Sequence, residues 1–270
     1  MDEIIGLILQ EKMRNLSQST AISRESSDSE QYSCPVCKDT RMISWKDEEG
    51  RLTTRFCECW PAYHAKKLLR ESGLAEAVER QNFDTFATDF AFQREMKALG
   101  MRYVAELIER SGKHEPRNPW MYIGGNPGSG KTHICTAVCG ELLKNNIDVK
   151  YMQWATEARD LKFAVNAEDF DDLVSGFTRP SVLYIDDLLK QKYADSPRFT
   201  DADIKIAFTI LNARYLMNKP TIISSEWDLV NQLMDADEGV FSRVYERCKG
   251  FTIMIGRGKD FNYRMKGEAV

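Results

Sequence analysis

The sequence has no excess of positive charge and no apolar run long enough to cross a membrane. Its 270 residues contain 37 Lys and Arg against 41 Asp and Glu, a formal net charge of −4, and its pI is about 5.6. The overall charge therefore does not indicate a nucleic-acid-binding protein. A locally basic surface that binds nucleic acid is still compatible with a net charge of −4. The apolar run from Ile4 to Leu9 is too short for a membrane span and lacks the flanks of a secretory leader. We expect a cytoplasmic protein without a membrane partner.

The cysteine content does not suit a disulfide-bonded protein. Seven cysteines are an odd number, and four of them fall within residues 34–59. Without a secretory leader, such a cluster favours reduced thiols on a metal ion. The other three lie in expected helices, where a cysteine usually behaves as a small buried hydrophobe: Cys135, Cys139 and Cys248.

The clustered cysteines have the spacing of a tetrahedral metal site. Cys34 and Cys37 form a C-x₂-C knuckle, and Cys57 and Cys59 form a tighter C-x-C pair. Four thiolates can close a structural zinc site that has no open position. The sequence therefore predicts a Zn²⁺ ion on these four residues, with disulfides or free thiols as the alternatives.

The segment between the two cysteine pairs alternates like a β-hairpin with a turn around Asp47 to Gly50. It is similar to a zinc ribbon. We expect a zinc-ribbon-like module and a following helix (61–80) to occupy residues 32–80. His64 could substitute for one cysteine, although a surface histidine is the simpler interpretation.

The first residues predict an amphipathic helix in front of a linker. Apolar side chains recur at helical spacing over residues 1–16. Residues 17–31 contain six serines and no aromatic residue, a composition that cannot bury enough surface to fold. A helix ahead of such a linker needs a surface for its apolar stripe, either on a partner protein or on its own chain.

From residue 81 to residue 270 the pattern is that of one α/β domain. A helix is expected over 91–110. Short apolar strands are expected at 120–124, 148–154, 181–186, 220–225 and 251–255. Amphipathic helices fit the gaps at 131–145, 155–175, 201–217 and 240–248. This alternation predicts a parallel sheet flanked by helices on both faces.

A complete phosphate-binding pattern lies between the first of these strands and the next helix. Residues 125–132 read GNPGSGKT and match G-x-x-x-x-G-K-[ST]. Its glycines permit backbone angles and close approaches that a Cβ would block, and its N–H groups cradle phosphates. Lys131 is expected to reach the β- and γ-phosphates of ATP, and Thr132 to ligate Mg²⁺. The nucleotide-binding residues are expected to be Gly125, Asn126, Pro127, Gly128, Ser129, Gly130, Lys131, Thr132, His133 and Asp186.

An acidic motif accompanies the loop. Residues 181–187 read SVLYIDD, an apolar strand that ends in two carboxylates. Asp186 is positioned to hold the Mg²⁺ ion, and Asp187 to orient or deprotonate the attacking water. The alternative is that the two aspartates cap the following helix.

With these motifs the chain resembles the DnaC/DnaI-type helicase loaders of bacteria and phages, a branch of the AAA+ ATPases within the IstB-like ATP-binding superfamily. The resemblance covers residues 81–266, and the zinc module is shared with only part of that group. It is carried by five segments: GNPGSGKTH at 125–133, SVLYIDD at 181–187, LNARYLMNKPTIISSE at 211–226, FSRVYERCKG at 241–250 and NYRMK at 262–266. It implies a P-loop AAA+ fold and an ATPase that uses ATP and Mg²⁺.

The resemblance also implies roles for residues late in the chain. The strand PTIISSE ends where the family keeps its γ-phosphate sensor, and this chain offers Ser224, Ser225 and Glu226 there, of which we choose Ser225. Arg243 matches the arginine finger that reaches the ATP of a neighbouring subunit, with Arg247 as second choice. Such a finger stabilises charge on the transferring phosphoryl group.

Only fifteen residues follow Ile255, which is too few for the helical lid of many AAA+ ATPases. We therefore expect a fold without a large C-terminal lid. Assembly would then rely on other surfaces and on the arginine finger. We expect an ATP-dependent homo-oligomer that turns over slowly when isolated.

The implied function is ATP-dependent delivery of a hexameric replicative DNA helicase onto single-stranded DNA. The N-terminal helix, the zinc module or both would engage the helicase. Lys and Arg side chains that track the DNA backbone, with aromatic side chains for stacking, are the requirement for the DNA channel. The candidates, each of which could also be an ordinary solvated side chain, are Lys162, Phe163, Lys190, Lys192, Tyr193 and Arg198.

Three other functions compete with the loader. An IstB-type transposition helper would have a closely similar core and a transposase as partner; the cysteine module and front helix favour the loader. A small-molecule kinase would need an acceptor pocket and a lid, whereas the paired aspartates and the Ser-Arg-Val segment favour hydrolysis at a subunit interface. A zinc-bearing adaptor would bind ATP without hydrolysing it, and Asp187→Asn would separate it from an ATPase.

Overall fold

The computed structural model divides into two compact units, one ending at Cys57 and the other beginning at Glu58. It describes residues 32–113, 115, 117–165, 167–190 and 199–265. The expected N-terminal helix and linker, and three of the expected DNA contacts (Lys192, Tyr193 and Arg198), lie outside the described residues. No helix in the described ranges has the length and apolar character that a membrane span requires.

The first unit contains the expected hairpin. Strand β1 (Met42–Lys46) pairs antiparallel with β2 (Leu52–Phe56), and Gly50 N–H donates to Asp47 O in the turn. Nearly every side chain of both strands is exposed. Among the described residues of this unit, the buried apolar side chains are three cysteines: Cys34, Cys37 and Cys57.

The second unit contains the expected parallel sheet. Its strands are β3 (Met121–Gly125), β4 (Val149–Gln153), β5 (Val182–Asp186), β6 (Thr221–Ser225) and β7 (Thr252–Ile255). Their order is β4-β5-β6-β3-β7, and every pairing is parallel. Every residue of β3, β5 and β6 is buried, because helices cover the sheet on both faces. The α/β architecture predicted from the alternating pattern is confirmed.

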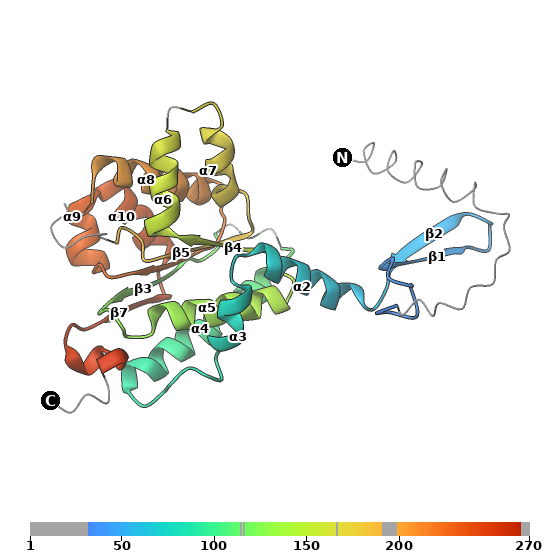
Figure 1. Cartoon of the computed structure of the whole chain (residues 1–270), viewed down its shortest axis with the longest axis horizontal. Helices are drawn as coiled ribbons and strands as arrows, with labels where there is room; N and C mark the ends of the chain where they lie inside the picture. Colours follow the sequence, from blue (N-terminus) through green and yellow to red (C-terminus); the bar gives the residue numbers. More distant parts are fainter. Residues whose placement is uncertain (1–31, 114, 116, 166, 191–198, 266–270) are drawn as a thin grey trace. The chain divides into compact units, whose positions relative to one another are not determined.

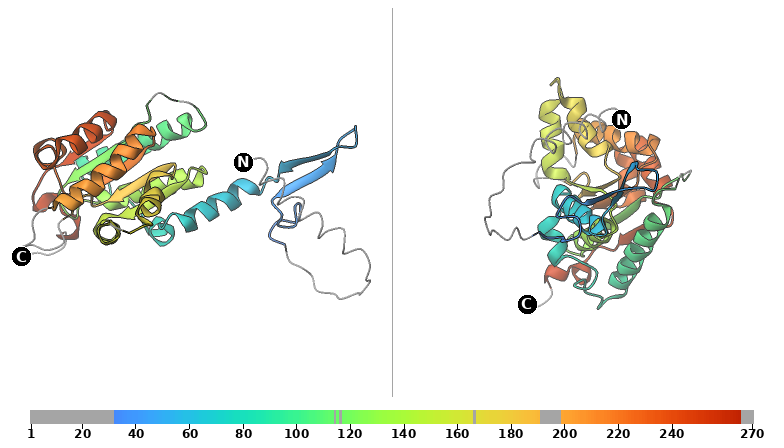
Figure 2. Two further views of the ribbon diagram at one scale, coloured as in Figure 1. Left: turned by 90° about the horizontal axis from the view of Figure 1, so that it is seen from above. Right: turned by 90° about the vertical axis from the view of Figure 1, so that its right-hand side faces the viewer.

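Helices form a layer on each face of the sheet (Figures 1 and 2). One layer contains α2 (Trp60–Glu71), α3 (Ala75–Arg80), α4 (Ala91–Arg110) and α5 (Lys131–Lys144). The other contains α6 (Trp154–Ala164), α7 (Phe170–Thr178), α8 (Asp201–Leu216), a π-helical turn (Leu229–Leu233), α9 (Met234–Ala236) and α10 (Glu238–Arg247). Adjacent strand residues alternate between the two cores: Tyr184 packs with the first layer, and Leu183 with the second.

Two helices expected to be continuous are broken. The segment 61–80 divides at Gly73, whose φ of +82° ends α2 in the left-handed conformation that glycine adopts without strain. The segment 155–175 divides into α6 and α7, and Asp171 and Asp172 occupy the first turn of α7, where carboxylates are favourable. Helices α2 and α3 pack against α5 in the second unit, whereas the sequence interpretation placed them with the cysteine module.

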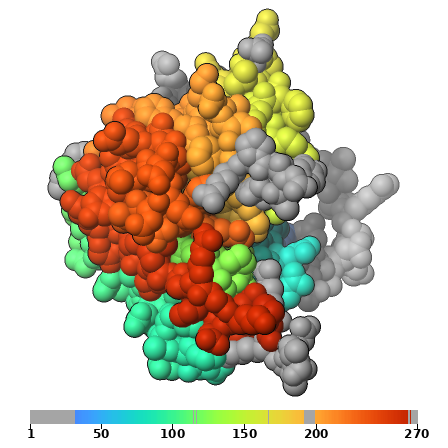
Figure 3. Space-filling view, turned by 90° about the vertical axis from the view of Figure 1, so that its left-hand side faces the viewer, coloured from blue at the N-terminus to red at the C-terminus, as the bar shows by residue number. Residues whose placement is uncertain are grey.

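The carboxyl ends of β3, β5 and β6 meet at one edge of the sheet, where ligands bind in open α/β folds. The chain returns to this edge after β7 as two 3₁₀ turns, Lys259–Phe261 and Tyr263–Met265. Tyr263 N–H donates to Gly128 O at 2.9 Å, and the Phe261 and Phe92 rings lie 5.4 Å apart. In the space-filling view of Figure 3, this red segment lies against the green surface of α4.

Candidate nucleotide-binding and metal sites

The phosphate loop connects β3 to α5, as the sequence predicts, and its backbone needs glycine. Gly128 and Gly130 have φ values of +74° and +93°. A Cβ on Gly128 would lie 2.1 Å from Asn262 Oδ1, and one on Gly125 would lie 2.1 Å from Ile255 O. The loop therefore has no room for side chains at these positions, and its backbone is held in the conformation that exposes N–H groups to an anion.

Lys131 is 5% exposed and is folded over the loop. Its Nζ donates to Gly125 O at 2.9 Å and to Asn126 O at 2.8 Å. Burial lowers the pKa of Lys131, while the carboxylates of Asp187 and Glu226 oppose that shift. Both acceptors are neutral carbonyls, so an anionic phosphate oxygen would be a stronger partner for this ammonium group.

Asp186 lies 7% exposed at the end of β5 and accepts four hydrogen bonds from hydroxyl groups. Its Oδ1 accepts from Thr132 at 3.0 Å, Tyr184 at 2.7 Å and Ser224 at 2.5 Å, and its Oδ2 accepts from Tyr151 at 3.1 Å. The pair of Thr132 and Asp186 provides the hard oxygen ligands that Mg²⁺ prefers, brought together from two elements. The sequence pattern did not reveal Tyr151, Tyr184 or Ser224 as supports, because their proximity depends on sheet register.

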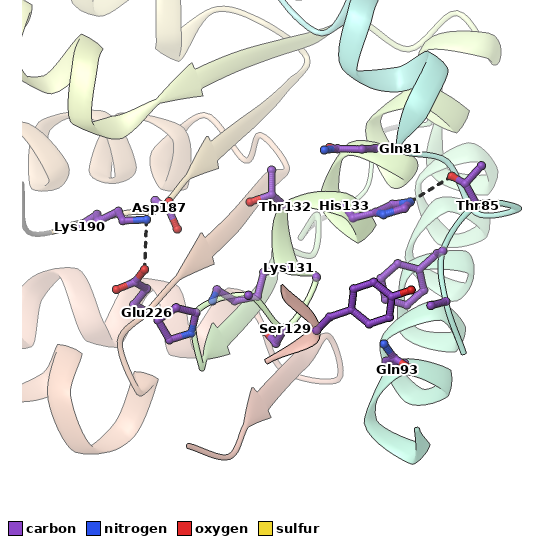
Figure 4. Close-up of a pocket in the computed structure, with 16 residues that line it drawn as sticks. Gln81, Thr85, Gln93, Ser129, Lys131, Thr132, His133, Asp187, Lys190 and Glu226 are labelled. Atoms are coloured by element: carbon purple, nitrogen blue, oxygen red, sulfur yellow. Dashed lines mark hydrogen bonds and ion pairs between the residues drawn. The ribbon is translucent and has the colours of Figure 1, made fainter. Parts of the chain in front are cut away.

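Asp187 is held differently from its neighbour. It has a φ of +58°, and its N–H donates to Ser224 Oγ at 2.9 Å. Lys190 Nζ bonds Asp187 Oδ2 at 2.7 Å and Glu226 Oε1 at 3.1 Å. Burial opposes the charged form of Lys190, but the two carboxylates outweigh burial and raise its pKa. Lys190, which the sequence offered as a DNA contact, thus lies in the wall of the nucleotide pocket (Figure 4).

Ser225 does not face this pocket, contrary to its choice as the γ-phosphate sensor. It is 1% exposed, and its hydroxyl donates to Leu188 O at 2.9 Å and accepts from Trp227 N–H at 3.1 Å. The following residue, Glu226, lines the pocket instead. Alternation along β6 turns successive side chains to opposite faces, so the sensor position depends on a register that sequence cannot provide.

The wall opposite Asp187 is built by residues that the motifs did not include. They come from the segment before α4, from α4 and from the C-terminal turns: Gln81, Thr85, Phe86, Ala87, Gln93 and Tyr263. His133 Nε2 donates to Asn82 O at 3.0 Å, and burial lowers the pKa of His133. The Phe86 ring meets the His133 ring edge-on at 5.1 Å. The aromatic pattern of residues 82–87 was the signal available in the sequence.

The two arginines offered as fingers lie on α10, outside this pocket, and both make contacts within their own chain. Arg243 donates to Asn212 Oδ1 at 2.9 Å and to Gly239 O at 2.7 Å, and lies 4.8 Å from the Phe208 ring centroid. Arg247 donates to Asn218 Oδ1 at 2.7 Å and to Tyr215 O at 2.9 Å. Neither arginine lines the nucleotide pocket of its own chain.

Two further DNA candidates lie on α6. Lys162 forms an ion pair with Asp203 at 2.5 Å. Phe163 is 82% exposed, which leaves its ring accessible for stacking.

The four predicted zinc ligands come together, with all four sulfur atoms within 4.8 Å of one another. Cys34 Sγ and Cys57 Sγ are 3.8 Å apart. A tetrahedron with Zn–S bonds of about 2.3 Å has edges of about 3.8 Å, so the thiols fit this ion. His64 takes no part in the cluster. Its Nδ1 bonds Asn146 Oδ1 at 3.1 Å, and its ring stacks on Trp60.

Comparisons with known proteins agree with this geometry. The model of the family described as IstB-like ATP binding protein matches residues 62–249. Phage-like element PBSX protein XkdC of Bacillus subtilis (strain 168) is 31% identical over 97% of both chains. Uncharacterized protein YqaM of the same strain is 30% identical over 85% of this chain and 71% of its own.

Among solved structures, that of DnaI has a TM-score of 0.51 and 19% identity, and the match covers 67% of this chain and 93% of that chain. At this identity the likeness concerns the fold. The fold, the phosphate loop and the two relatives agree with the family model, which spans more than half of the chain. The chain belongs to the IstB-like ATP-binding protein family.

Proposed function

We propose that this chain is an ATP-dependent loader that delivers a hexameric replicative DNA helicase onto single-stranded DNA at the initiation of replication. The observation that carries the proposal is a phosphate loop whose Thr132 hydroxyl bonds the Asp186 carboxylate at 3.0 Å, in a chain of the IstB-like ATP-binding family. The fold shared with DnaI and the resemblance of five segments to the DnaC/DnaI-type loaders favour a helicase as the partner.

In this proposal each side chain of the site has a task. Loop residues 125–133 bind the phosphates. The Lys131 ammonium group exchanges its hydrogen bonds to the loop carbonyls for hydrogen bonds to the β- and γ-phosphates. Thr132 and Asp186 hold Mg²⁺, which offsets negative charge on the phosphates. Asp187 orients the attacking water once its carboxylate is released from Lys190.

Arg243 of a neighbouring subunit would complete the site and stabilise the charge that develops on the phosphoryl group. This requires Arg243 to exchange its contacts with Asn212 and Gly239 for contacts across a subunit interface. Glu226, which directly follows β6 and lines the pocket, would replace Ser225 as the candidate that senses the γ-phosphate. Hydrolysis would therefore be slow in an isolated subunit.

The hydrolytic step is tested by Asp187→Asn, measured as phosphate release and as ATP binding. The variant should bind ATP and accumulate as an ATP-bound oligomer, while hydrolysis falls about 10²- to 10⁴-fold, the usual range for a general base. Unaltered hydrolysis would remove Asp187 from this role. Arg243→Ala should retain ATP binding and lose hydrolysis in the assembled state. Arg247→Ala, on the same helix, tests the second choice of finger and should leave hydrolysis unchanged; the reverse result would assign the finger to Arg247.

The partner is tested by co-purification with the replicative helicase of the same host in the presence of ATP. Deleting residues 1–60 removes the first unit and all four expected zinc ligands. We expect the shortened chain to bind ATP and to lose the helicase. Helicase retention by the shortened chain would contradict the assignment of partner contact to the N-terminal helix and zinc module.

A transposition helper is the second candidate, because the matching family model is described as IstB-like. The four-cysteine cluster and the expected N-terminal helix favour the loader. Co-purification distinguishes the two functions directly. Recovery of a transposase instead of a helicase would establish the second candidate.

A further inference from the structure

Gln93, in the first turn of α4, is a polar side chain buried in the wall of the nucleotide pocket. It is 2% exposed and lines the pocket together with Phe86 and Tyr263. Its Oε1 accepts a hydrogen bond from Phe90 N–H at 3.0 Å. The amide oxygen is therefore committed to the start of its own helix.

This hydrogen bond determines what Gln93 offers to a ligand. Since Phe90 N–H can only donate, the oxygen of the amide must face it, and the nitrogen must point elsewhere. Figure 4 shows the Gln93 amide nitrogen directed toward the interior of the pocket. Within the ranges that the structure describes, Nε2 donates to no side chain or carbonyl. Gln93 thus presents its amide N–H donors to the pocket.

The position of Gln93 matches the base of the nucleotide and not its phosphates. Asp187 and Lys190 lie at one side of the pocket in Figure 4, and Gln93 lies at the other, beyond Ser129 of the loop. The adjacent wall contains the aromatic rings of Phe86 and Tyr263. Aromatic side chains stack on the faces of bases, and a buried N–H donor matches a ring-nitrogen acceptor on the edge of a base.

We propose that Gln93 is a specificity residue for the nucleobase: its Nε2 donates a hydrogen bond to a ring nitrogen of the adenine of ATP. This inference rests on the proposed binding of ATP to the phosphate loop. It adds a base contact from α4, which none of the sequence motifs includes.

The test compares two variants of Gln93. They distinguish loss of the Nε2–H donor from loss of the hydrogen bond between Phe90 N–H and Oε1 at the start of α4. Gln93→Met removes both. Gln93→Glu keeps an oxygen for Phe90 N–H and replaces the amide N–H donor with a second oxygen. The matched control is Gln232→Met, because Gln232 Oε1 makes the same kind of bond to Asp228 N–H at 2.9 Å outside this pocket.

Equilibrium binding is measured for the full-length chain with Mg²⁺, using ATP and inorganic tripolyphosphate, which has phosphates and no base. We expect Gln93→Met to weaken ATP binding about five- to tenfold, the usual effect of one hydrogen bond, and Gln93→Glu to weaken it further. Tripolyphosphate binding should be unchanged in both variants, and Gln232→Met should bind both ligands as the wild type does.

The acceptor atom is identified with 1-deaza-, 3-deaza- and 7-deaza-ATP. One of these analogues should bind the wild type more weakly than ATP but bind Gln93→Met as ATP does, because the contact is already lost in that variant. Unchanged ATP binding in both Gln93 variants, or no such analogue among the three, would overturn the base contact. A wild type that binds neither ATP nor tripolyphosphate would instead overturn the proposed function.

Discussion

The cysteine module and the nucleotide unit use opposite means to hold their strands. In the module, β1 and β2 leave Leu52 and Phe56 each 60% exposed, and the described side chains that are buried are cysteines. In the nucleotide unit, β3, β5 and β6 are buried at every position between two helical layers. A short hairpin without an apolar core is marginal in water. We therefore expect the stability of the module to depend on a metal ion held by the cysteine cluster, and the stability of the nucleotide unit to depend on its apolar core and on nucleotide binding.

Metal removal should have the largest effect, and this effect should be confined to the cysteine module. Structural Zn²⁺ contributes about 10–16 kcal/mol of apparent binding free energy in small zinc modules, so chelation or Cys57→Ser should unfold residues 32–57. Amide exchange and zinc stoichiometry measure this. The nucleotide unit should keep its thermal transition. Protection of residues 32–57 from exchange without metal would show that the module folds without the ion.

Core truncation should affect the nucleotide unit alone. Met96 on α4 is fully buried, so Met96→Ala should lower the free energy of unfolding of this unit by about 2–5 kcal/mol, through lost transfer energy and a residual cavity. Met101, 54% exposed on the same helix, supplies the control, since Met101→Ala should change it by no more than about 0.5 kcal/mol. Equal effects of the two substitutions on denaturant unfolding would show that the core is not where the structure places it. Zinc content should be unaltered in both.

ATP with Mg²⁺ should stabilise one unit and not the other. A ligand at one hundred times its Kd adds about 2.7 kcal/mol to the unit that binds it. In calorimetric scans, the unfolding temperature of the nucleotide unit should therefore rise with ATP concentration. The rate of amide exchange in residues 32–57 should stay constant. Stabilisation of the module by ATP would indicate coupling between the units.

The smallest expected effect is a loss of ATP affinity at alkaline pH. Burial lowers the pKa of Lys131 below its usual value of about 10.5. The ammonium form binds phosphates, so affinity should fall as the pH rises through that lowered pKa. In the absence of ATP, the free energy of unfolding should change in the opposite direction. The folded state binds this proton less tightly than the unfolded state does, so the nucleotide unit becomes more stable as the pH rises and Lys131 loses its proton. Lys131→Met should bind ATP weakly at every pH, and an equally steep fall in that variant would exclude Lys131 as the cause.

Sequence patterns predicted the parts of the site that are contiguous. The loop 125–132 and the four cysteines are short runs whose residue types follow from local geometry, such as a positive φ at Gly128. The five strands were found because each is a short run rich in apolar residues between amphipathic helical segments. The wall formed by Gln93 and Tyr263 was missed because it joins segments far apart in the chain.

The orientation of Ser225 could not be predicted, since it depends on which face of β6 a side chain occupies. The same limit applied to Tyr151, whose bond to Asp186 comes from the pairing of β4 with β5. The sequence pattern also did not show where a predicted helix is interrupted. The positive φ at Gly73 divides a segment whose apolar spacing is helical on both sides.

The most direct measurement is a calorimetric titration of the full-length chain with ATP, with and without Mg²⁺, for the wild type and for Lys131→Met. We predict one ATP per chain, tighter binding with Mg²⁺, and a large loss of affinity in the variant, whose two Nζ hydrogen bonds to the loop are absent. No saturable binding by the wild type, or equal binding by the variant, would contradict the assignment of the phosphate loop as the ATP site.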